Sequence, residues 1–183
     1  MVIKMTTRLT PGTNPAVRDV VYTDDATATR IINHFIGKVR GKRILDPCRG
    51  AGAFYNNFPA GNTKLWCEIS EGRDFFRHRD PVDWIISGPP WSAPYLRPMT
   101  KHAMSLANDI VWLVPLANVV LRARLEDMQK RGFGLKEVLT LSAAEKPPGY
   151  PQSGFQLAAV HISKSFNGTT KWSGHLLKAA NDN

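Results

Sequence analysis

The chain has 183 residues, enough for one hydrophobic core, so we expect a single domain. Its hydrophobic fraction of 43% and charged fraction of 21% are typical of a soluble globular protein, no apolar run approaches the roughly 18 residues of a membrane span, and two cysteines, Cys48 and Cys67, are too few for a disulfide framework. Residues 1–15 lack the basic-then-apolar order of a secretory signal, so we expect a cytoplasmic protein, and the net charge of +9 favours nucleic acid as the partner class.

The first predicted element is an amphipathic helix. Thr23, Asp24 and Asp25 offer N-caps for it, and Gly37 marks its end. Its apolar residues recur at i, i+3, i+4, i+7 and i+8, the spacing of one helix face: Ala28, Ile31, Ile32, Phe35 and Ile36.

Short apolar runs follow this helix, and we predict strands there because each run is bounded by Gly, Pro or Asn: 43–46, 64–69, 83–87, 109–115, 136–141 and 156–163. Two more helices are predicted, over 98–107 and 116–131, and in the second Leu121, Leu125 and Met128 share one face. Alternating strands and helices predict an α/β fold with a mostly parallel sheet. We place it in one domain over residues 16–165, between a flexible arm over 1–15 and a tail over 166–183.

The residues after each strand are candidates for a site, because ligands of parallel sheets bind beyond the carboxyl ends of the strands. The first strand runs into Asp46-Pro47-Cys48-Arg49-Gly50-Ala51-Gly52-Ala53-Phe54, an acid followed by a Gly-x-Gly turn that a ligand can approach closely. The third glycine of a dinucleotide fingerprint would fall at Tyr55, which argues against a cofactor held by its pyrophosphate. A glycine turn without a ligand is the alternative for this segment alone.

Acidic residues also follow the second predicted strand. Glu68 stands 18 positions after Gly50, where a carboxylate can accept both hydroxyls of a ribose. Asp74 and Phe75 then offer an acceptor for an exocyclic amine and a ring that can flank a purine. Taken singly, these residues are equally a solvated acid and a turn with a core aromatic.

The third predicted strand runs directly into Gly88-Pro89-Pro90-Trp91. Two consecutive prolines have fixed φ angles and no amide protons, so the carbonyl groups around them are rigid and free to accept hydrogen bonds. This suits a site that binds an amine. A loop that merely ends a strand is the alternative.

Together these segments resemble the class I methyltransferases that methylate amino groups, in particular the small phage-type DNA N6-adenine methyltransferases, over residues 22–162. The resemblance implies a single Rossmann-like domain with helices on both faces of the sheet and an antiparallel strand near the C-terminus. It implies S-adenosyl-L-methionine as the cofactor, with Tyr22-Thr23 at its methionine end, Glu68 at its ribose and Asp74-Phe75 at its adenine. The cofactor residues implied in this way are Tyr22, Thr23, Asp46, Pro47, Cys48, Gly50, Gly52, Phe54, Glu68, Ile69, Asp74, Phe75 and Ser87.

The same resemblance makes Gly88, Pro89, Pro90 and Trp91 the catalytic residues, with the Pro89 carbonyl accepting from the target amine and Trp91 stacking on an extruded base. The chain departs from the family here, because the first position is Asp, Asn or Ser in the family and Gly88 has no side-chain acceptor. Ser87 precedes it, but strand alternation points its side chain the other way unless the backbone twists at Gly88. Whether Ser87 substitutes is left open.

Phosphate contacts are expected from cations near the carboxyl ends of the strands, namely Arg49, Arg97, Lys101, Arg122 and Lys146. The loop over 143–154 follows a strand at the same edge, and it either closes over the target or is a plain surface connection. The histidines lack ligand spacing, so no metal is expected.

Three functions fit these observations. The first is methylation of the N6 amine of adenine in DNA or RNA. The second is methylation of another amine, such as a protein glutamine, a guanine amine or a small molecule, which Gly88 keeps open. The third is a non-catalytic nucleic-acid-binding protein that retains the cofactor fold. No membrane partner is expected, and the chain is compatible with a monomer or a homodimer.

Overall fold

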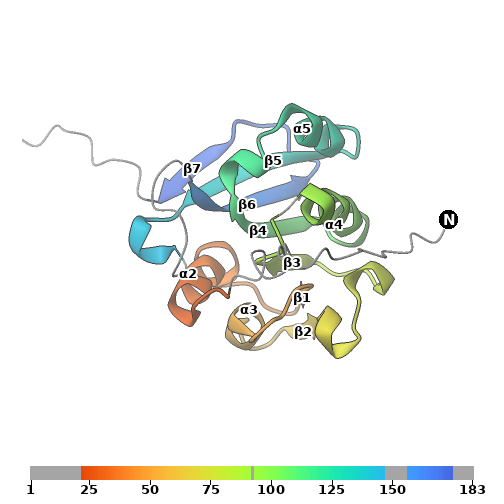
Figure 1. The fold of residues 1–183 in the computed structure, drawn as a ribbon, viewed down its shortest axis with the longest axis vertical. Coiled ribbons are helices and arrows are strands. Elements are labelled where there is room, and N and C mark those ends of the chain that lie inside the picture. Colours follow the sequence, from red (N-terminus) through yellow and green to blue (C-terminus); the bar gives the residue numbers. More distant parts are fainter. Residues whose placement is uncertain (1–21, 92, 147–155, 175–183) are drawn as a thin grey trace, which may run out of the picture.

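The computed structural model describes residues 22–91, 93–146 and 156–174, which form a central sheet covered by helices on both faces (Figure 1). The expected arm over 1–15 lies outside these residues. The strands are β1 (Arg43–Asp46), β2 (Thr63–Trp66), β3 (Trp84–Ser87), β4 (Asp109–Pro115), β5 (Phe133–Thr140), β6 (Leu157–Lys164) and β7 (Lys171–Gly174). The helices are α2 (Asp25–Ile36), α3 (Ala53–Asn57), α4 (Ala93–Leu106) and α5 (Arg122–Gln129), with short 3₁₀ helices η1 (Ile69–Glu71), η2 (Phe75–Arg77), η3 (Leu116–Asn118) and η4 (Ala143–Glu145).

In the described ranges the sheet has seven strands in the order β2-β1-β3-β4-β6-β5-β7, and β6 runs antiparallel to both of its neighbours. The predicted α/β fold, with a mostly parallel sheet and an antiparallel strand near the C-terminus, is therefore confirmed. β2 and β3 pair with opposite sides of β1. The loops after β1 and β3 consequently diverge, and a reversal of strand order of this kind opens the crevice in which α/β proteins bind ligands.

Side chains that alternate along the strands fill a core on each face of the sheet. Ile85 packs with Leu96 and Met99 of α4, whereas its neighbour Ile86 packs with Ile31 of α2. β4 is buried on both faces and is accordingly a continuous apolar run, the pattern by which it was predicted. The described helices are all too short or too polar to cross a membrane.

Two strand ends were predicted wrongly, because β2 ends at Trp66 instead of residue 69 and β5 begins at Phe133 instead of residue 136. Three further predicted boundaries were wrong. α4 begins at Ala93, whereas the prediction began at Pro98 because proline is common at the first position of a helix. Pro98 instead lies inside the helix. The helix expected over 116–131 is divided into η3 and α5, and Leu121 is 51% exposed at the N-cap of α5 instead of lying on a buried face.

The third wrong boundary is the tail over 166–183, because Lys171–Gly174 forms strand β7, which pairs in parallel with β5. β7 has no buried apolar side chain that could have signalled a strand. Polar contacts hold it instead: Ser173 Oγ donates to Glu137 Oε1 of β5 at 2.7 Å, and Lys171 Nζ lies 3.0 Å from the same oxygen.

Candidate functional site

A cavity of about 440 Å³ lies at the carboxyl edge of the sheet, at the reversal between β1 and β3. It brings together most of the predicted cofactor residues: Tyr22, Thr23, Pro47, Cys48, Gly50, Phe54, Glu68, Ile69, Asp74 and Phe75. Gly88 and Pro90 of the predicted catalytic segment and Arg49 also line it. Ala51, Ala53, Phe76, Tyr95 and Met99 line it without having been predicted. Tyr95 and Met99 are one helical turn apart on α4, and the late predicted start of that helix hid this relationship.

The glycine turn after β1 brings the backbone to the cavity wall. Gly50 has φ +50°, a left-handed conformation that favours glycine, and its N–H donates to Glu68 Oε2 at 2.8 Å. The Tyr22 ring packs over it, because Tyr22 Cε1 lies 3.5 Å from the position that a Cβ atom of residue 50 would take. Gly52, the N-cap of α3, has φ +96°. Tyr22 is itself 63% exposed, so it covers the turn from the solvent side.

Glu68 is held as an acceptor at the cavity wall. Its Oε1 accepts from the N–H of Ser70 at 3.1 Å and from Ser70 Oγ at 2.9 Å, while Oε2 accepts from Gly50. Partial burial raises the pKa of Glu68, but the hydrogen bonds from Gly50 and Ser70 and the charge of Arg49 outweigh burial and lower it. The carboxylate is therefore ionised and retains acceptor sites for hydroxyl donors.

The loop that carries Asp74 and Phe75 is fixed from two sides. Asp74 Oδ1 accepts from the N–H of Phe76 at 2.9 Å, which caps η2. His102 Nε2 of α4 lies 3.0 Å from the Phe75 carbonyl and 3.1 Å from the His78 carbonyl, so this nitrogen carries a proton. The His102 ring also packs edge-on against Phe75, 4.8 Å between centroids. The sequence identified Asp74 and Phe75 but missed His102 as their support.

Asp46 lies behind the cavity wall instead of in it. It is fully buried, and its Oδ1 accepts from Ser87 Oγ at 2.6 Å and from the Cys48 N–H at 3.2 Å. Its Oδ2 is buried and has no hydrogen-bond partner among the described residues. Burial raises the pKa of Asp46 to about 7, against the lowering effect of these hydrogen bonds.

The contact with Asp46 also answers the question left open for Ser87. Its side chain is fully buried and points to β1, so among the residues described here Ser87 is not part of the cavity wall. It does not replace the acceptor that Gly88 lacks.

The Pro-Pro segment reaches the cavity through Gly88 and Pro90. A Cβ atom at residue 88 would lie 3.4 Å from Thr23 Oγ1 and 3.7 Å from Phe54 Cε2, which is ordinary contact, so a side chain can begin there without displacing its neighbours. Trp91 is anchored elsewhere: its Nε1–H donates to the Leu113 carbonyl of β4 at 3.0 Å. Pro89 and Trp91 are not among the residues that line the cavity, and the indole of Trp91 makes a structural contact that the sequence did not predict. Stacking of Trp91 on a target base stays a prediction.

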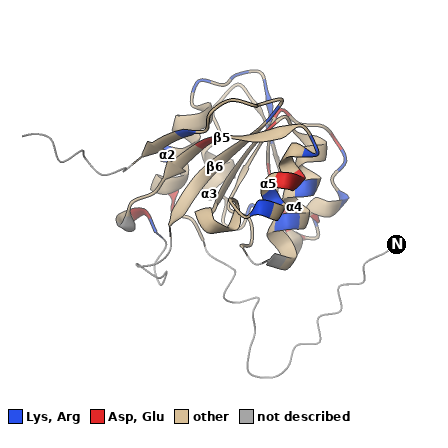
Figure 2. Ribbon diagram, turned by 90° about the horizontal axis from the view of Figure 1, so that it is seen from above, with Lys and Arg blue, Asp and Glu red and all other residues tan. Residues whose placement is uncertain are grey.

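The predicted phosphate contacts lie at two places. Arg49 is at the cavity, where it pairs with Glu71 and stacks on Trp66 with its guanidinium carbon 3.8 Å from the ring centroid. Arg97 and Lys101 lie on α4 and Arg122 on α5, two helices that both carry basic residues (Figure 2). Of these two helices, α4 contributes Tyr95 and Met99 to the cavity wall. Lys146 follows η4.

Acidic partners on α5 reduce the net positive charge around the cations of α4 and α5. Arg97 Nε lies 2.6 Å and Lys101 Nζ 3.2 Å from the carboxylate of Asp127, and Arg122 Nε lies 2.8 Å from that of Glu126. The hydrogen bond from Arg97 lowers the pKa of Asp127 to about 2, so this carboxylate stays ionised at neutral pH.

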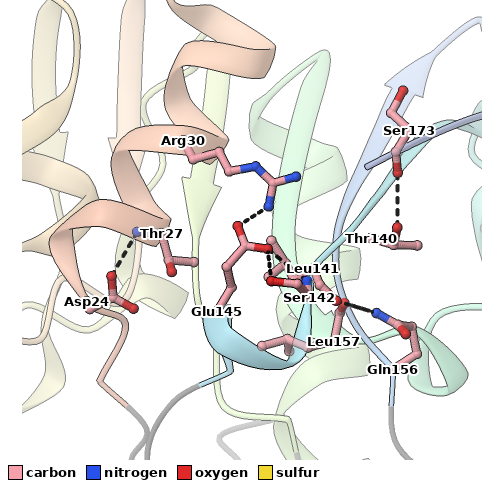
Figure 3. Close-up of polar contacts among 10 residues, drawn as sticks. All are labelled: Asp24, Thr27, Arg30, Thr140, Leu141, Ser142, Glu145, Gln156, Leu157 and Ser173. Atoms are coloured by element: carbon pink, nitrogen blue, oxygen red, sulfur yellow. Dashed lines mark hydrogen bonds and ion pairs between the residues drawn. The ribbon is translucent and has the colours of Figure 1, made fainter. Parts of the chain in front are cut away.

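The loop expected over 143–154 falls in part on residues 147–154, outside the described residues. What precedes it is bound to α2, because Glu145 pairs with Arg30 and its Oε2 accepts from the Ser142 N–H at 2.7 Å (Figure 3). On the far side, Gln156 Nε2 donates to the Leu141 carbonyl at 2.9 Å. Both flanks of the segment are therefore held against the sheet and α2.

No protein-family model and no curated protein matches the chain. Solved structures do match it. A protein of Pyrococcus horikoshii described as an RNA methyltransferase is similar with a TM-score of 0.65 and 18% identity, over 87% of this chain and 95% of that one. A protein of Listeria monocytogenes described as a class I S-adenosylmethionine-dependent methyltransferase gives 0.62 and 13%, over 94% of this chain and 69% of that one.

A modification subunit of a type I restriction enzyme from Vibrio vulnificus gives a TM-score of 0.60 and 12% identity, over 90% of this chain and 49% of that one, so this chain spans about half of its length. The fold is that of the class I S-adenosylmethionine-dependent methyltransferases.

Proposed function

We propose that this protein is an S-adenosylmethionine-dependent methyltransferase. The observation that carries the proposal is one cavity, at the reversal of strand order, that joins the glycine turn, Glu68, the Asp74 loop and the Pro-Pro segment. Four segments that are separate in the sequence meet there, in the fold of this class of enzymes. A volume of about 440 Å³ is within the range of small-molecule and cofactor sites.

The residues present fit this cofactor. Glu68 is ionised and has remaining acceptor sites, so it would bind the ribose hydroxyls. Ile69 and Phe75 would flank the adenine, and Asp74 would accept a hydrogen bond from the adenine amine. The glycine turn and the backbone of the Tyr22-Thr23 segment would hold the methionine part. When bound, the cofactor would supply an electrophilic methyl group for transfer to the amine nitrogen, with its sulfur keeping the electron pair of the broken carbon–sulfur bond and water taking the proton that the amine loses.

The protein's own task is to align the amine and stabilise the positive charge that develops on nitrogen. Carbonyls of the Pro-Pro segment, which reaches the cavity through Gly88 and Pro90, suit this task because the two prolines fix their backbone and have no amide protons. The net charge of +9 attracts polyanions, and Arg97 and Lys101 lie on the helix that also presents Tyr95 and Met99 to the cavity. We therefore propose the N6 amine of adenine in DNA or RNA as the target. The descriptions of the Pyrococcus and Vibrio proteins support a nucleic-acid substrate.

One observation favours a second candidate, methylation of a different amine such as a protein glutamine, a guanine amine or a small molecule. Gly88, at the first position of the Pro-Pro segment, has no side chain to accept a hydrogen bond, and the Ser87 side chain points away from the cavity. A site with fewer fixed acceptors places fewer demands on the shape of its target.

The test is to incubate the protein with methyl-labelled S-adenosylmethionine and separate DNA, RNA, protein and small-molecule pools, then digest a labelled nucleic acid to nucleosides. N6-methyladenine in the digest supports the first candidate, and label in another pool supports the second. Label in no pool, from a protein that still binds S-adenosylhomocysteine in calorimetry, contradicts both and leaves a non-catalytic binding protein.

A further inference from the structure

Gly88 leaves space in the cavity wall that another side chain faces. The position of a Cβ atom at residue 88 lies 3.4 Å from Thr23 Oγ1. Both residues line the cavity. The Thr23 hydroxyl oxygen therefore lies close to the position where a side chain at residue 88 would start.

This hydroxyl is available for a ligand. Among residues 22–91, 93–146 and 156–174, Thr23 Oγ1 has no hydrogen-bond partner. The neighbouring hydroxyl of Ser87, by contrast, is buried and donates to Asp46. A threonine hydroxyl has two acceptor lone pairs besides its one proton, so it can receive a hydrogen bond from an amine.

The backbone at Thr23 is well anchored. Thr23 directly precedes the N-cap of α2, Asp24, whose Oδ1 accepts from the Thr27 N–H at 2.9 Å (Figure 3). α2 is in turn fixed to the sheet by Ile31 and Ile36, both fully buried. An acceptor on this anchored segment costs little entropy to align with a bound amine.

We infer that the Thr23 hydroxyl, just before α2, supplies the amine acceptor that residue 88, just after β3, does not supply. The inference rests on the proposed methyltransferase function and names the residue that completes its site. The target amine then has two protein acceptors: Thr23 Oγ1 on one side and a carbonyl of the Pro-Pro segment on the other. Both stabilise the nitrogen as it becomes positively charged, and neither takes part in a covalent bond.

The experiment compares Thr23→Val, which keeps the shape of the side chain and removes the hydroxyl, with Thr23→Ser, which keeps the hydroxyl. We expect Thr23→Val to lower kcat on the pool that the wild type labels by about tenfold or more, the loss of one hydrogen bond to a developing charge, and Thr23→Ser to stay within about threefold of the wild type. Binding of S-adenosylhomocysteine, measured by calorimetry, should change less than about threefold in both variants. An equal loss of cofactor affinity and kcat would assign Thr23 to cofactor binding and overturn the inference.

A second variant tests the equivalence of the two positions. Gly88→Asn places a carbonyl oxygen where the structure has room for a Cβ, so in the Thr23→Val background it should restore at least part of the lost kcat. A fully active Thr23→Val variant overturns the inference and leaves the proposed function intact. A wild type that labels no pool overturns both, and if Gly88→Asn alone then creates activity, the acceptor was absent and Thr23 did not supply it.

Discussion

The hydroxyl of Ser87, the last residue of β3, donates a 2.6 Å hydrogen bond to the buried carboxyl group of Asp46, the last residue of β1. This contact joins the two strands whose following loops form the cavity. It also means that Asp46 and Ser87, both predicted from the sequence to bind the cofactor, bind each other instead. The pair therefore fixes the spacing of the two loops from behind the cavity wall.

The first prediction concerns the pH dependence that this pair produces. Burial raises the pKa of Asp46 from 3.8 to about 7, so between these values the folded protein holds a proton that the unfolded chain releases. The contribution to stability is complete below pH 3.8 and is lost as the pH rises through about 7. Asp46→Asn should remove it, and the unfolding free energy of wild type minus variant should fall by a few kcal/mol, on the order of 4 at most, between pH 4 and 7.

Urea unfolding of both proteins across this pH range measures the difference. Other carboxyl groups titrate equally in both and cancel. A difference that does not change with pH would show that Asp46 ionises at its ordinary pKa, and the contact with Ser87 would then be a charged hydrogen bond.

The second prediction concerns Glu68. Glu68→Gln keeps the size of the side chain but removes the charge, and hydrogen bonds to charged groups contribute about 1.5 to 3 kcal/mol. We expect the affinity for S-adenosylhomocysteine, measured by calorimetry, to fall by about tenfold to one hundredfold. Glu126→Gln is the matched control, because it removes the same charge on α5, where Glu126 pairs with Arg122 instead of lining the cavity. Equal losses in both variants would contradict a ribose contact at Glu68.

The sequence predicted β1, β3 and β4 well because these strands are short runs of mostly buried apolar residues, and β1 and β4 lie at their predicted bounds. The edge strand β2 has no fully buried residue, and it ends at Trp66 instead of residue 69. It predicted which residues after the strands line the cavity because the carboxyl ends of parallel strands meet at one edge of the sheet. It did not predict β7, whose Ser173 and Lys171 side chains bind Glu137 of β5, because a polar contact between separate segments leaves no local pattern. Nor did it predict the direction of individual side chains: Ser87 and Asp46 point to each other, and the Trp91 indole binds β4.

The third prediction concerns the cations of α4. Asp127 pairs with both Arg97 and Lys101, so it reduces the attraction of this surface for phosphate. Asp127→Asn should strengthen binding of duplex DNA and steepen the fall of log affinity with log salt, by about 0.9 for each additional phosphate that the protein neutralises. Fluorescence anisotropy across a salt series measures both. Asp80→Asn is the control, because it removes the same charge at an exposed residue before β3, and it should leave the slope unchanged. Weaker binding by Asp127→Asn would show that this surface is not used.

The last prediction concerns Trp91, whose indole N–H donates to the Leu113 carbonyl while its own carbonyl accepts from Asn118 Nδ2 at 3.1 Å. The ring also packs against the cores on both faces of the sheet. We therefore expect Trp91 to hold the Pro-Pro segment to β4, in addition to any contact with the target.

Two variants of Trp91 separate these roles. Trp91→Phe retains a ring but loses the indole hydrogen bond, so the unfolding free energy should fall by about 1 kcal/mol while the affinity for nucleic acid changes little. Trp91→Ala removes the ring as well, and the unfolding free energy should fall by about 3 kcal/mol, with methyl transfer lost because the Pro-Pro segment is no longer fixed. Urea unfolding, anisotropy and methyl labelling on the same preparations distinguish the outcomes. If Trp91→Ala is as stable as the wild type but binds nucleic acid more weakly by about 1 to 3 kcal/mol, the ring acts by stacking on a base and the structural role is refuted.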